Sequence, residues 1–382
     1  MQNSIYNSEE LVLFRDQLRK YIESEIVPHG DEWEKIGKVP REVFTKMGEL
    51  GFLGLRYGEQ YGGSELDTVA TAVLAEELGR STFSGFAISV LVHTDMASPH
   101  LNNAGNDDQR AKYMPGIITG ETVTAVAVTE PDAGSDVAGI KTRAIKDGDD
   151  WVLNGSKMFI TNGPVADFYT VLMQTDPKKK FRGLNFFFVP RDTPGFSCGK
   201  PFDLLGTRST PISEVAFKDC MVPHTHMLGA EGKGLSNLLS ILAEIRTMTA
   251  ALAVGLQRAA MDDSIQYAHE RAQFGQTISN YQLIQAKVAN LAVDLEASKL
   301  LTYKASHMID DKEEALKEAS MAKYFATEAA TRAGDQATRI LGAYAYSMEY
   351  SAQRYYRDNR FLLYGGGTHE ILQPNIAKWV GL

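Results

Sequence analysis

Residues 127–136, Ala127-Val128-Thr129-Glu130-Pro131-Asp132-Ala133-Gly134-Ser135-Asp136, decide the fold. The stretch leaves an apolar run and passes into Pro, Gly and hydroxyl residues, which is typical of a loop at the end of a strand. Backbone N–H groups and hydroxyls gathered in such a loop can hold a planar polar ligand. On its own, the pattern also fits an ordinary surface loop.

The sequence after this loop keeps a β-type texture to about residue 225. Residues 142–146 and 151–153 flank Asp147-Gly148-Asp149-Asp150, a turn signal that predicts a hairpin. Further β-rich runs follow, separated by Gly, Pro, Asp and Lys: Phe168–Thr175, Gly183–Pro190 and Glu214–Phe217. Several short strands at this spacing indicate a small barrel or sandwich.

Helices are expected on both sides of the β-rich region. Leu11, Phe14, Leu18 and Tyr21 recur at the spacing of one helix face, and Pro28 is expected to end or kink that helix. Long helices return beyond residue 226. The sequence therefore predicts an α+β, mainly α protein with three domains: a helical domain at 1–123, a β domain at 124–225 and a second helical domain at 226–382.

Composition argues against several classes of protein. The 382 residues carry a formal net charge of −9 with interspersed signs, so no basic stripe indicates a nucleic-acid partner. Cys198 and Cys220 lack metal-ligand spacing and the eight histidines are scattered, so no metal is expected. No secretory signal is visible, and no apolar run approaches the ~18 residues of a membrane span. A cytoplasmic protein without a membrane span is the expectation.

Common catalytic signatures are also missing. No GxGxxG follows an expected strand, and residues 229–234 do not match a phosphate-binding loop. His369-Glu370 lacks the second histidine of a zinc-protease helix, and GxSxG is absent. The chemistry must therefore be sought in the loop at 127–136 and in segments that accompany it.

Four later segments accompany that loop: Asn154-Gly155-Ser156-Lys157-Met158-Phe159-Ile160-Thr161-Asn162-Gly163, Tyr267–Gly275 followed by Gln282, Arg339-Ile340-Leu341-Gly342, and Gly367-Thr368-His369-Glu370-Ile371. Together with residues 127–136 they resemble the signatures of the acyl-CoA dehydrogenase family, in family order and with family-like spacing across nearly the whole chain. The helix–β–helix order is also the architecture of that family.

The resemblance implies a small β-barrel domain followed by a C-terminal four-helix bundle, with FAD between them. The flavin ring would be lined by Val126, Ala127, Val128, Thr129, Phe159, Ile160 and Thr161, with the Thr161 hydroxyl reaching toward flavin N5. Arg271 and Phe274 would contact the pyrophosphate of FAD in a neighbouring subunit, which implies a homodimer or homotetramer. The cofactor shell would be completed by Gln282, Arg339 (where the family usually has glutamine), Gly342, Thr368 and Glu370.

The reaction implied is oxidation of the Cα–Cβ bond of an acyl thioester, carried on CoA or on an acyl-carrier protein. A carboxylate must take the α-proton, and donors on the thioester carbonyl must stabilise the developing enolate. Ser135 would join the cofactor shell and touch the pantetheine arm, and Gly366 would supply a backbone N–H to the carbonyl. Arg246 and Gly367 would flank the substrate.

Neither of the two positions at which the family carries its catalytic base holds an acid in this chain. Most members carry glutamate in Tyr-Glu-Gly-Thr, where this chain has Gly365-Gly366-Gly367-Thr368. A branch resembling isovaleryl-CoA dehydrogenase places it directly before an arginine that corresponds to Arg246, and here Ile245 holds that place. Glu244, one residue earlier, is the expected base if a bulge or register shift turns it inward. Otherwise it pairs with Arg246 or faces solvent, and Glu370 is the weaker candidate.

Other functions on the same fold remain open at this point. An acyl thioester oxidase or a flavin monooxygenase would suit a site that lacks its usual acid, as would a flavin-binding protein without activity. The electron acceptor would be a flavoprotein or oxygen. The glycines at 365 and 366 predict a widened pocket for a bulky or branched acyl group in a fatty-acid-type metabolism.

Overall fold

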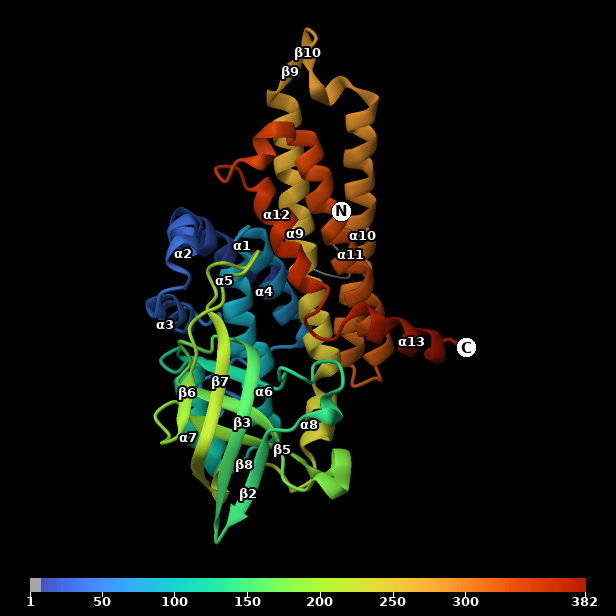
Figure 1. Cartoon of the computed structure of the whole chain (residues 1–382). Helices are drawn as coiled ribbons and strands as arrows, with labels where there is room; N and C mark the ends of the chain where they lie inside the picture. The colour runs from blue at the N-terminus through green and yellow to red at the C-terminus, as the bar shows by residue number, and fades with distance from the viewer. Residues whose placement is uncertain (1–7) are drawn as a thin grey trace.

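Helices form both ends of the chain and a sheet lies between them in this computed structural model, which describes residues 8–382 (Figure 1). The first helix, α1 (Glu9–Tyr21), is capped by Ser8, whose Oγ accepts a hydrogen bond from Leu11 N at 3.2 Å. It continues through one π turn (Ile22–Ile26) and one 3-10 turn that contains Pro28. The expected kink at Pro28 is therefore a change of helix type rather than an abrupt end.

The other N-terminal helices place an apolar wall behind the sheet. The helix α4 and the short π-helix η4 (Val92–Ala97) are buried along nearly their whole length. Contacts between η4 and the first strand join this wall to the β domain. The remaining bounds are α2 Gly30–Ile36, α3 Arg41–Glu49, α4 Thr68–Arg80, α5 Ser84–Leu91, α6 Ser98–Ala104 and α7 Asp107–Ile118.

The β domain is a single curled sheet with strand order β6-β7-β3-β2-β4-β5-β8, to which β1 adds by parallel pairing with β4. The predicted hairpin is present, because β2 ends at Asp147 and β3 begins at Asp150 opposite it. Beyond residue 225, β8 still pairs with β5. The strands are β1 Thr124–Ala127, β2 Arg143–Asp147, β3 Asp150–Thr161, β4 Phe168–Gln174, β5 Leu184–Pro190, β6 Phe196–Cys198, β7 Ile212–Pro223 and β8 Met227–Leu228.

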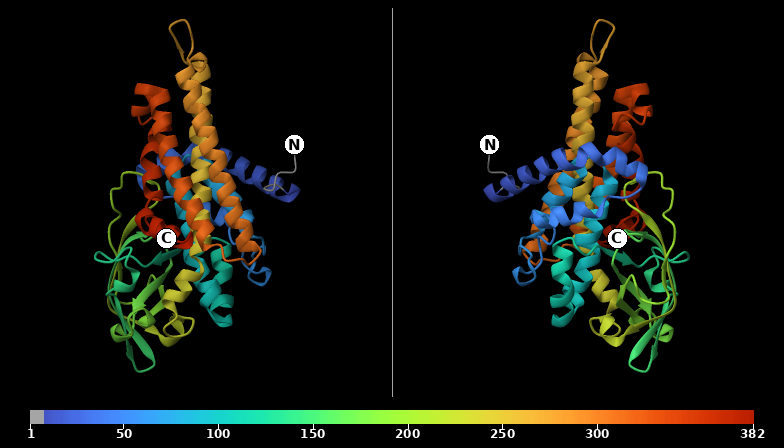
Figure 2. Two further views of the ribbon diagram at one scale, coloured as in Figure 1. Left: turned by 90° about the vertical axis from the view of Figure 1, so that its right-hand side faces the viewer. Right: turned by 90° about the vertical axis from the view of Figure 1, so that its left-hand side faces the viewer.

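The C-terminal region is a bundle of long helices that rises past the rest of the molecule (Figure 2). Two helices are joined by a small hairpin at the tip, and α4 packs against the bundle. The elements are α8 Gly234–Ser240, α9 Leu242–Glu270, β9 Ala272–Gln273, β10 Gln276–Thr277, α10 Gln282–Asp310, α11 Leu316–Leu341, α12 Ala352–Leu362 and α13 His369–Trp379.

One break matters for the site. Helices α8 and α9 are separated at Ile241, where the axis bends by 40°. Within residues 8–382 no single helix could cross a bilayer, and only this bent pair reaches the required length and apolar composition. Most of α9 from Ile245 to Ala260 is buried in the protein core. Glu244 thus lies in the first turn of a new helix, just after the bend.

Candidate active site

The loop that follows β1 is fixed by a buried ion pair. Lys157 of β3 is fully buried, and its Nζ donates to Glu130 Oε1 at 2.8 Å and to the carbonyl of Val128 at 3.0 Å. Burial lowers the pKa of Lys157 to about 8, although Glu130 acts in the opposite direction. Thr129 is held as well, because its carbonyl accepts from Met158 N at 2.8 Å. These contacts fix residues 128–130 at the end of β1, and we call this segment the lip.

The residues predicted to line the flavin fall into two groups, according to whether their side chains face the barrel core or the domain surface. Ala127 and Ile160 point into the barrel core and can offer only backbone atoms to a ligand. Side chains of Val126, Val128 and Thr129 are half-buried and lie at the domain surface. Successive residues of a strand point to opposite faces, so a wall of consecutive residues cannot present every side chain.

A bulge in β3 turns an aromatic ring outward beside this lip. The register of β3 against β7 shifts between Lys157 and Ile160, and Phe159 there has a φ of +58° and is 61 % exposed. Its ring lies 5.4 Å from that of Phe202. A bulky residue in this backbone region is strained, and such strain is typical of positions that serve a ligand. Two residues on, Thr161 is half-buried.

The glycine segment 365–367 faces the start of α9. Gly366 has a φ of +70°, and a Cβ atom at that position would lie 3.5 Å from Ile245 Cγ2 and 3.6 Å from Thr249 Oγ1. Arg246 Nε donates to the Gly366 carbonyl at 3.1 Å. The structure therefore brings both of the family's base positions, 245 and 366, against each other. Thr368 follows as the N-cap residue of α13, and Glu370 is exposed in its first turn.

Glu244 does not pair with Arg246, which was one of the two alternatives that the sequence left for it. Its Oε2 lies 2.7 Å from Arg56 Nη1, and the other end of that guanidinium lies 3.3 Å from Asp95 Oδ1. Asp95 is buried on η4, and its second carboxylate oxygen has no partner among the described residues. Burial raises the pKa of Asp95 to about 6 against the opposing effect of Arg56.

Sequence reasoning missed Arg56 and Asp95. Nothing in the loop around Arg56 distinguishes it from a surface arginine. Asp95 had a usable signal, because it is the lone acid within the apolar helical run from Ser84 to Ala97. Buried carboxylates of this kind are rare unless they are paired.

A second group of predicted cofactor residues lies at the far end of the molecule. Arg271 and Phe274 sit at the β9–β10 hairpin, which Figure 1 shows at the opposite end of the bundle from the sheet. Phe274 is 95 % exposed. Arg271 lies over the ring of Tyr344, which follows Gly342, and Arg339 is exposed with its Nε 2.7 Å from Asp335. Gln282 begins α10 beside the same hairpin. A single chain does not bring this group to the β-domain wall.

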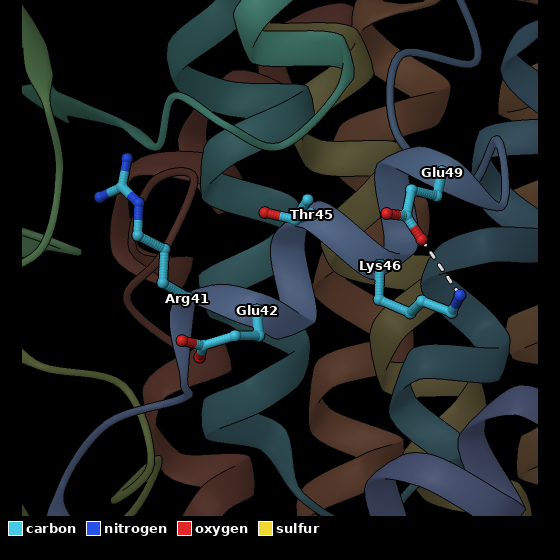
Figure 3. A pocket seen from close by; sticks show the side chains of 5 residues that line it. All are labelled: Arg41, Glu42, Thr45, Lys46 and Glu49. Carbon is cyan, nitrogen blue, oxygen red and sulfur yellow. Dashed lines mark hydrogen bonds and ion pairs between the residues drawn. The ribbon is translucent and has the colours of Figure 1, made fainter.

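A hollow on the surface of the described residues adjoins the predicted substrate arm. Ser135 is exposed, and beside it Lys141, Arg143 and Lys180 line this hollow of about 340 Å³. A second hollow, of about 560 Å³, follows one face of α3 (Figure 3). Its lining is Arg41, Glu42, Thr45, Lys46 and Glu49, none of them a predicted site residue.

Three family models match the chain in succession: the N-terminal domain of acyl-CoA dehydrogenase at residues 8–121, its middle domain at 125–220 and its C-terminal domain at 232–381. The benzylmalonyl-CoA dehydrogenase of Aromatoleum aromaticum is 40% identical over 98% of both chains. The CarC subunit of the caffeyl-CoA reductase-Etf complex of Acetobacterium woodii is 37% identical over 98% of both. The crystal structure of an acyl-CoA dehydrogenase from Geobacillus kaustophilus superposes with a TM-score of 0.95 at 36% identity, covering 100% of each chain.

Proposed function

Because the chain belongs to the acyl-CoA dehydrogenase family, we propose that Glu244 is the base with which it removes the α-proton of its substrate. The protein is an FAD-dependent oxidoreductase that dehydrogenates the CH–CH bond of an acyl thioester. A bound flavin would supply the acceptor for the β-hydride. What the chain's own residues must supply is a place for the thioester and a carboxylate for the proton.

The observation that supports Glu244 is its place beside two positions that cannot take a proton. Ile245 and Gly366 meet across the site, and Glu244 directly precedes Ile245 just after the bend at Ile241. Both residues lie in α9 after the bend, so their side chains differ in direction by about 100°, and the bulge that the sequence expectation invoked is not present between them. Arg56 holds the Glu244 carboxylate at 2.7 Å, which restricts its rotamers.

The described residues fit FAD on two surfaces. The hydroxyls of Thr129 and Thr161 make no hydrogen bond within residues 8–382, and Phe159 stands exposed beside them. At the tip, a Cβ atom on Gly342 would meet nothing within 4 Å, so a ligand can approach its backbone. Arg271 would bind phosphate oxygens there through its planar fork.

The separation of these two surfaces supports a homodimer or a homotetramer. The tip residues Arg271 and Phe274 cannot reach the β-domain wall of their own chain, so a second copy would bring them to it. We further propose domain limits near 123 and 225, a cytoplasmic location and a role in fatty-acid-type metabolism. A flavoprotein as electron acceptor is favoured by the name of the Acetobacterium relative, whose complex includes Etf.

The experiment is an anaerobic stopped-flow titration with a panel of acyl-CoA thioesters. Flavin bleaching by the parent protein and its loss in Glu244→Gln would support the proposal, because the amide keeps the shape of the side chain and removes its proton affinity. A base contributes about 10²–10⁴-fold, and a sole base on a C–H bond should lie at the high end. Glu296→Gln, at an exposed position on α10, is the matched control and should bleach at the parent rate.

A second function is favoured by one observation. Among the described residues, a Cβ atom on Gly365 would meet only the carbonyl of Phe361, at 3.7 Å, so there is space beside this position. Such an opening could admit oxygen to the flavin, as an acyl thioester oxidase or a flavin monooxygenase requires. Reoxidation of substrate-reduced protein by air within milliseconds would favour the oxidase, whereas reoxidation over minutes would favour the dehydrogenase.

A further inference from the structure

A lysine that the reaction does not use lies directly beneath the glycine segment. Lys323 of α11 is fully buried, and its Nζ donates to the carbonyl of Gly367 at 2.8 Å and to that of Leu363 at 3.2 Å. It forms no ion pair within the part of the chain that the structure describes. A buried ammonium is costly unless its donors are used, so its contacts with two carbonyls define its role here.

A second buried cation holds the same segment from the other side. Arg246 of α9 donates through Nε to the carbonyl of Gly366 at 3.1 Å and through Nη1 to Ser320 Oγ at 2.9 Å. Ser320 lies one helical turn before Lys323 on α11. Two helices thus fix three carbonyls of residues 363–367 with charged donors, which are stronger than neutral ones.

The carbonyls of Leu363, Gly366 and Gly367 accept hydrogen bonds, whereas two N–H groups of the same segment donate none. Gly365 N donates to Phe361 O at 3.1 Å, but within residues 8–382 no backbone hydrogen bond is formed by the N–H of Gly366 or Gly367. The C=O and N–H of a trans peptide point in opposite directions. Fixing the Gly366 carbonyl on Arg246 therefore turns the Gly367 N–H away from the cations. The positive φ values of +70° and +106° at Gly366 and Gly367 allow this arrangement.

We propose that Lys323 is a positioning residue: by holding the carbonyls of Leu363 and Gly367 at the two ends of the segment, it fixes the backbone between them, so that the free N–H groups of Gly366 and Gly367 stay directed at the thioester carbonyl. We call the hydrogen bonds from Lys323 and Arg246 to the carbonyls of residues 363–367 the clamp. The chemical purpose of the clamp rests on the proposed function, whereas its existence rests only on the contacts above. Preorganised N–H donors stabilise a developing enolate oxygen because they need no rearrangement during the reaction.

The clamp should depend on pH. Burial, together with the nearby charge of Arg246, lowers the pKa of Lys323 to about 7, while Glu370 and Glu328 act in the opposite direction. His369 is the remaining titratable group beside it, from α13, and donates to or accepts from Glu328 at 3.0 Å. Lys323 is therefore mostly protonated below pH ~7 and loses its charge as the pH rises through that value. The neutral amine that remains is a weaker hydrogen-bond donor.

Hydrogen–deuterium exchange of the holoprotein tests the clamp without using activity. At pH 6, Lys323→Met should raise exchange in the peptide spanning 363–368 at least tenfold over the parent. The control Lys317→Met, an exposed lysine on the same helix, should leave it unchanged. Lys323→Arg, which keeps its charge, should protect the segment equally at pH 6 and pH 8.5, whereas the parent should lose protection once intrinsic rates are corrected for. Equal exchange in Lys323→Met and parent would overturn the clamp.

A 3-thiaacyl-CoA, which can lose an α-proton but no β-hydride, tests the positioning role. The long-wavelength band that its enolate forms with oxidised flavin reports α-proton acidity in the site. Lys323→Met should weaken this band and slow flavin reduction about 10- to 100-fold, with FAD still bound. An unchanged band in a variant with raised exchange would overturn the positioning role. A parent protein that no thioester reduces would contradict the proposed function instead, and the exchange result would still decide the clamp.

Discussion

Ile245 packs against Gly366, so that a Cβ atom placed on Gly366 would lie 3.5 Å from Ile245 Cγ2. These are the two places where relatives were expected to carry their glutamate, one on α9 and one in the segment between α12 and α13. Their contact explains how either place could serve one α-carbon, because a carboxylate from either side would enter the same space. In this chain neither position holds an acid, and Glu244, the proposed base, lies one residue before Ile245.

The contact predicts that the base can be moved. In the Glu244→Gln background, Ile245→Glu should restore anaerobic flavin reduction at least tenfold, because the new carboxylate would face Gly366. Ile245→Gln in the same background has the same shape without the base and should restore nothing. Equal rates in the two double variants would show that this contact lies away from the α-carbon.

Refilling the space beside Gly365 should change substrate preference. Gly365 lacks the positive φ of Gly366 and Gly367, so Gly365→Tyr is compatible with the backbone. The ring should reduce turnover of branched or cyclic thioesters more than that of short straight ones, as kcat/KM measurements on matched acyl-CoA pairs would reveal. A loss of equal size for both classes would instead indicate a disturbed segment.

The hollow beside Ser135 should bind the charged end of the substrate carrier. Lys141, Arg143 and Lys180 line it, so Arg143→Glu should raise KM for an acyl-CoA several-fold and leave kcat unchanged. The effect should shrink at high salt, because exposed charges are screened within about 10 Å at 0.1 M ionic strength. Lys46→Glu in the hollow on α3 is the control and should leave KM unaltered.

Asp95 should make thermal stability depend on pH. Burial raises the pKa of Asp95 in the folded state to about 6. Between the ordinary pKa of an aspartate and 6, the folded protein therefore binds more protons at this residue than the unfolded protein does. The free energy of unfolding falls as the pH rises through this range. At pH 7 the penalty is about 3 kcal/mol at most, because a tenfold change in proton affinity corresponds to roughly 1.4 kcal/mol. Asp95→Asn should therefore gain more in Tm at pH 7 than at pH 4.5. Asp108→Asn, on an exposed face of α7, should show no such trend across the same buffers.

The tip residues should govern retention of the cofactor. Arg271→Ala should weaken FAD binding, measured by flavin fluorescence after dialysis, without lowering the Tm of the apoprotein. Phe274→Ala should act in the same direction, since its ring is almost fully exposed in the isolated chain. Full FAD retention in both variants would argue against a cofactor contact at the hairpin.

The parts of the fold that the sequence predicted are those set by local patterns. The turn at Asp147–Asp150 specifies its hairpin through its own residues. Alternation could not have shown that Ile160 faces the core, because the bulge between Lys157 and Ile160 shifts the buried register of β3 by one residue. The partners of Glu244 could not be predicted in this way. Arg56 and Asp95 reach it from a loop and a π-helix far away in sequence, and only tertiary packing brings them together.

The distance between the hairpin tip and the β-domain wall has a genetic consequence. If each site takes its wall from one chain and its tip from another, a mixed dimer of a Glu244→Gln chain and an Arg271→Ala chain contains one site with both defects and one with neither. Two impaired proteins, coexpressed, should therefore complement each other and recover up to half of the parent activity per mixed dimer, more than either homodimer shows when FAD is limiting.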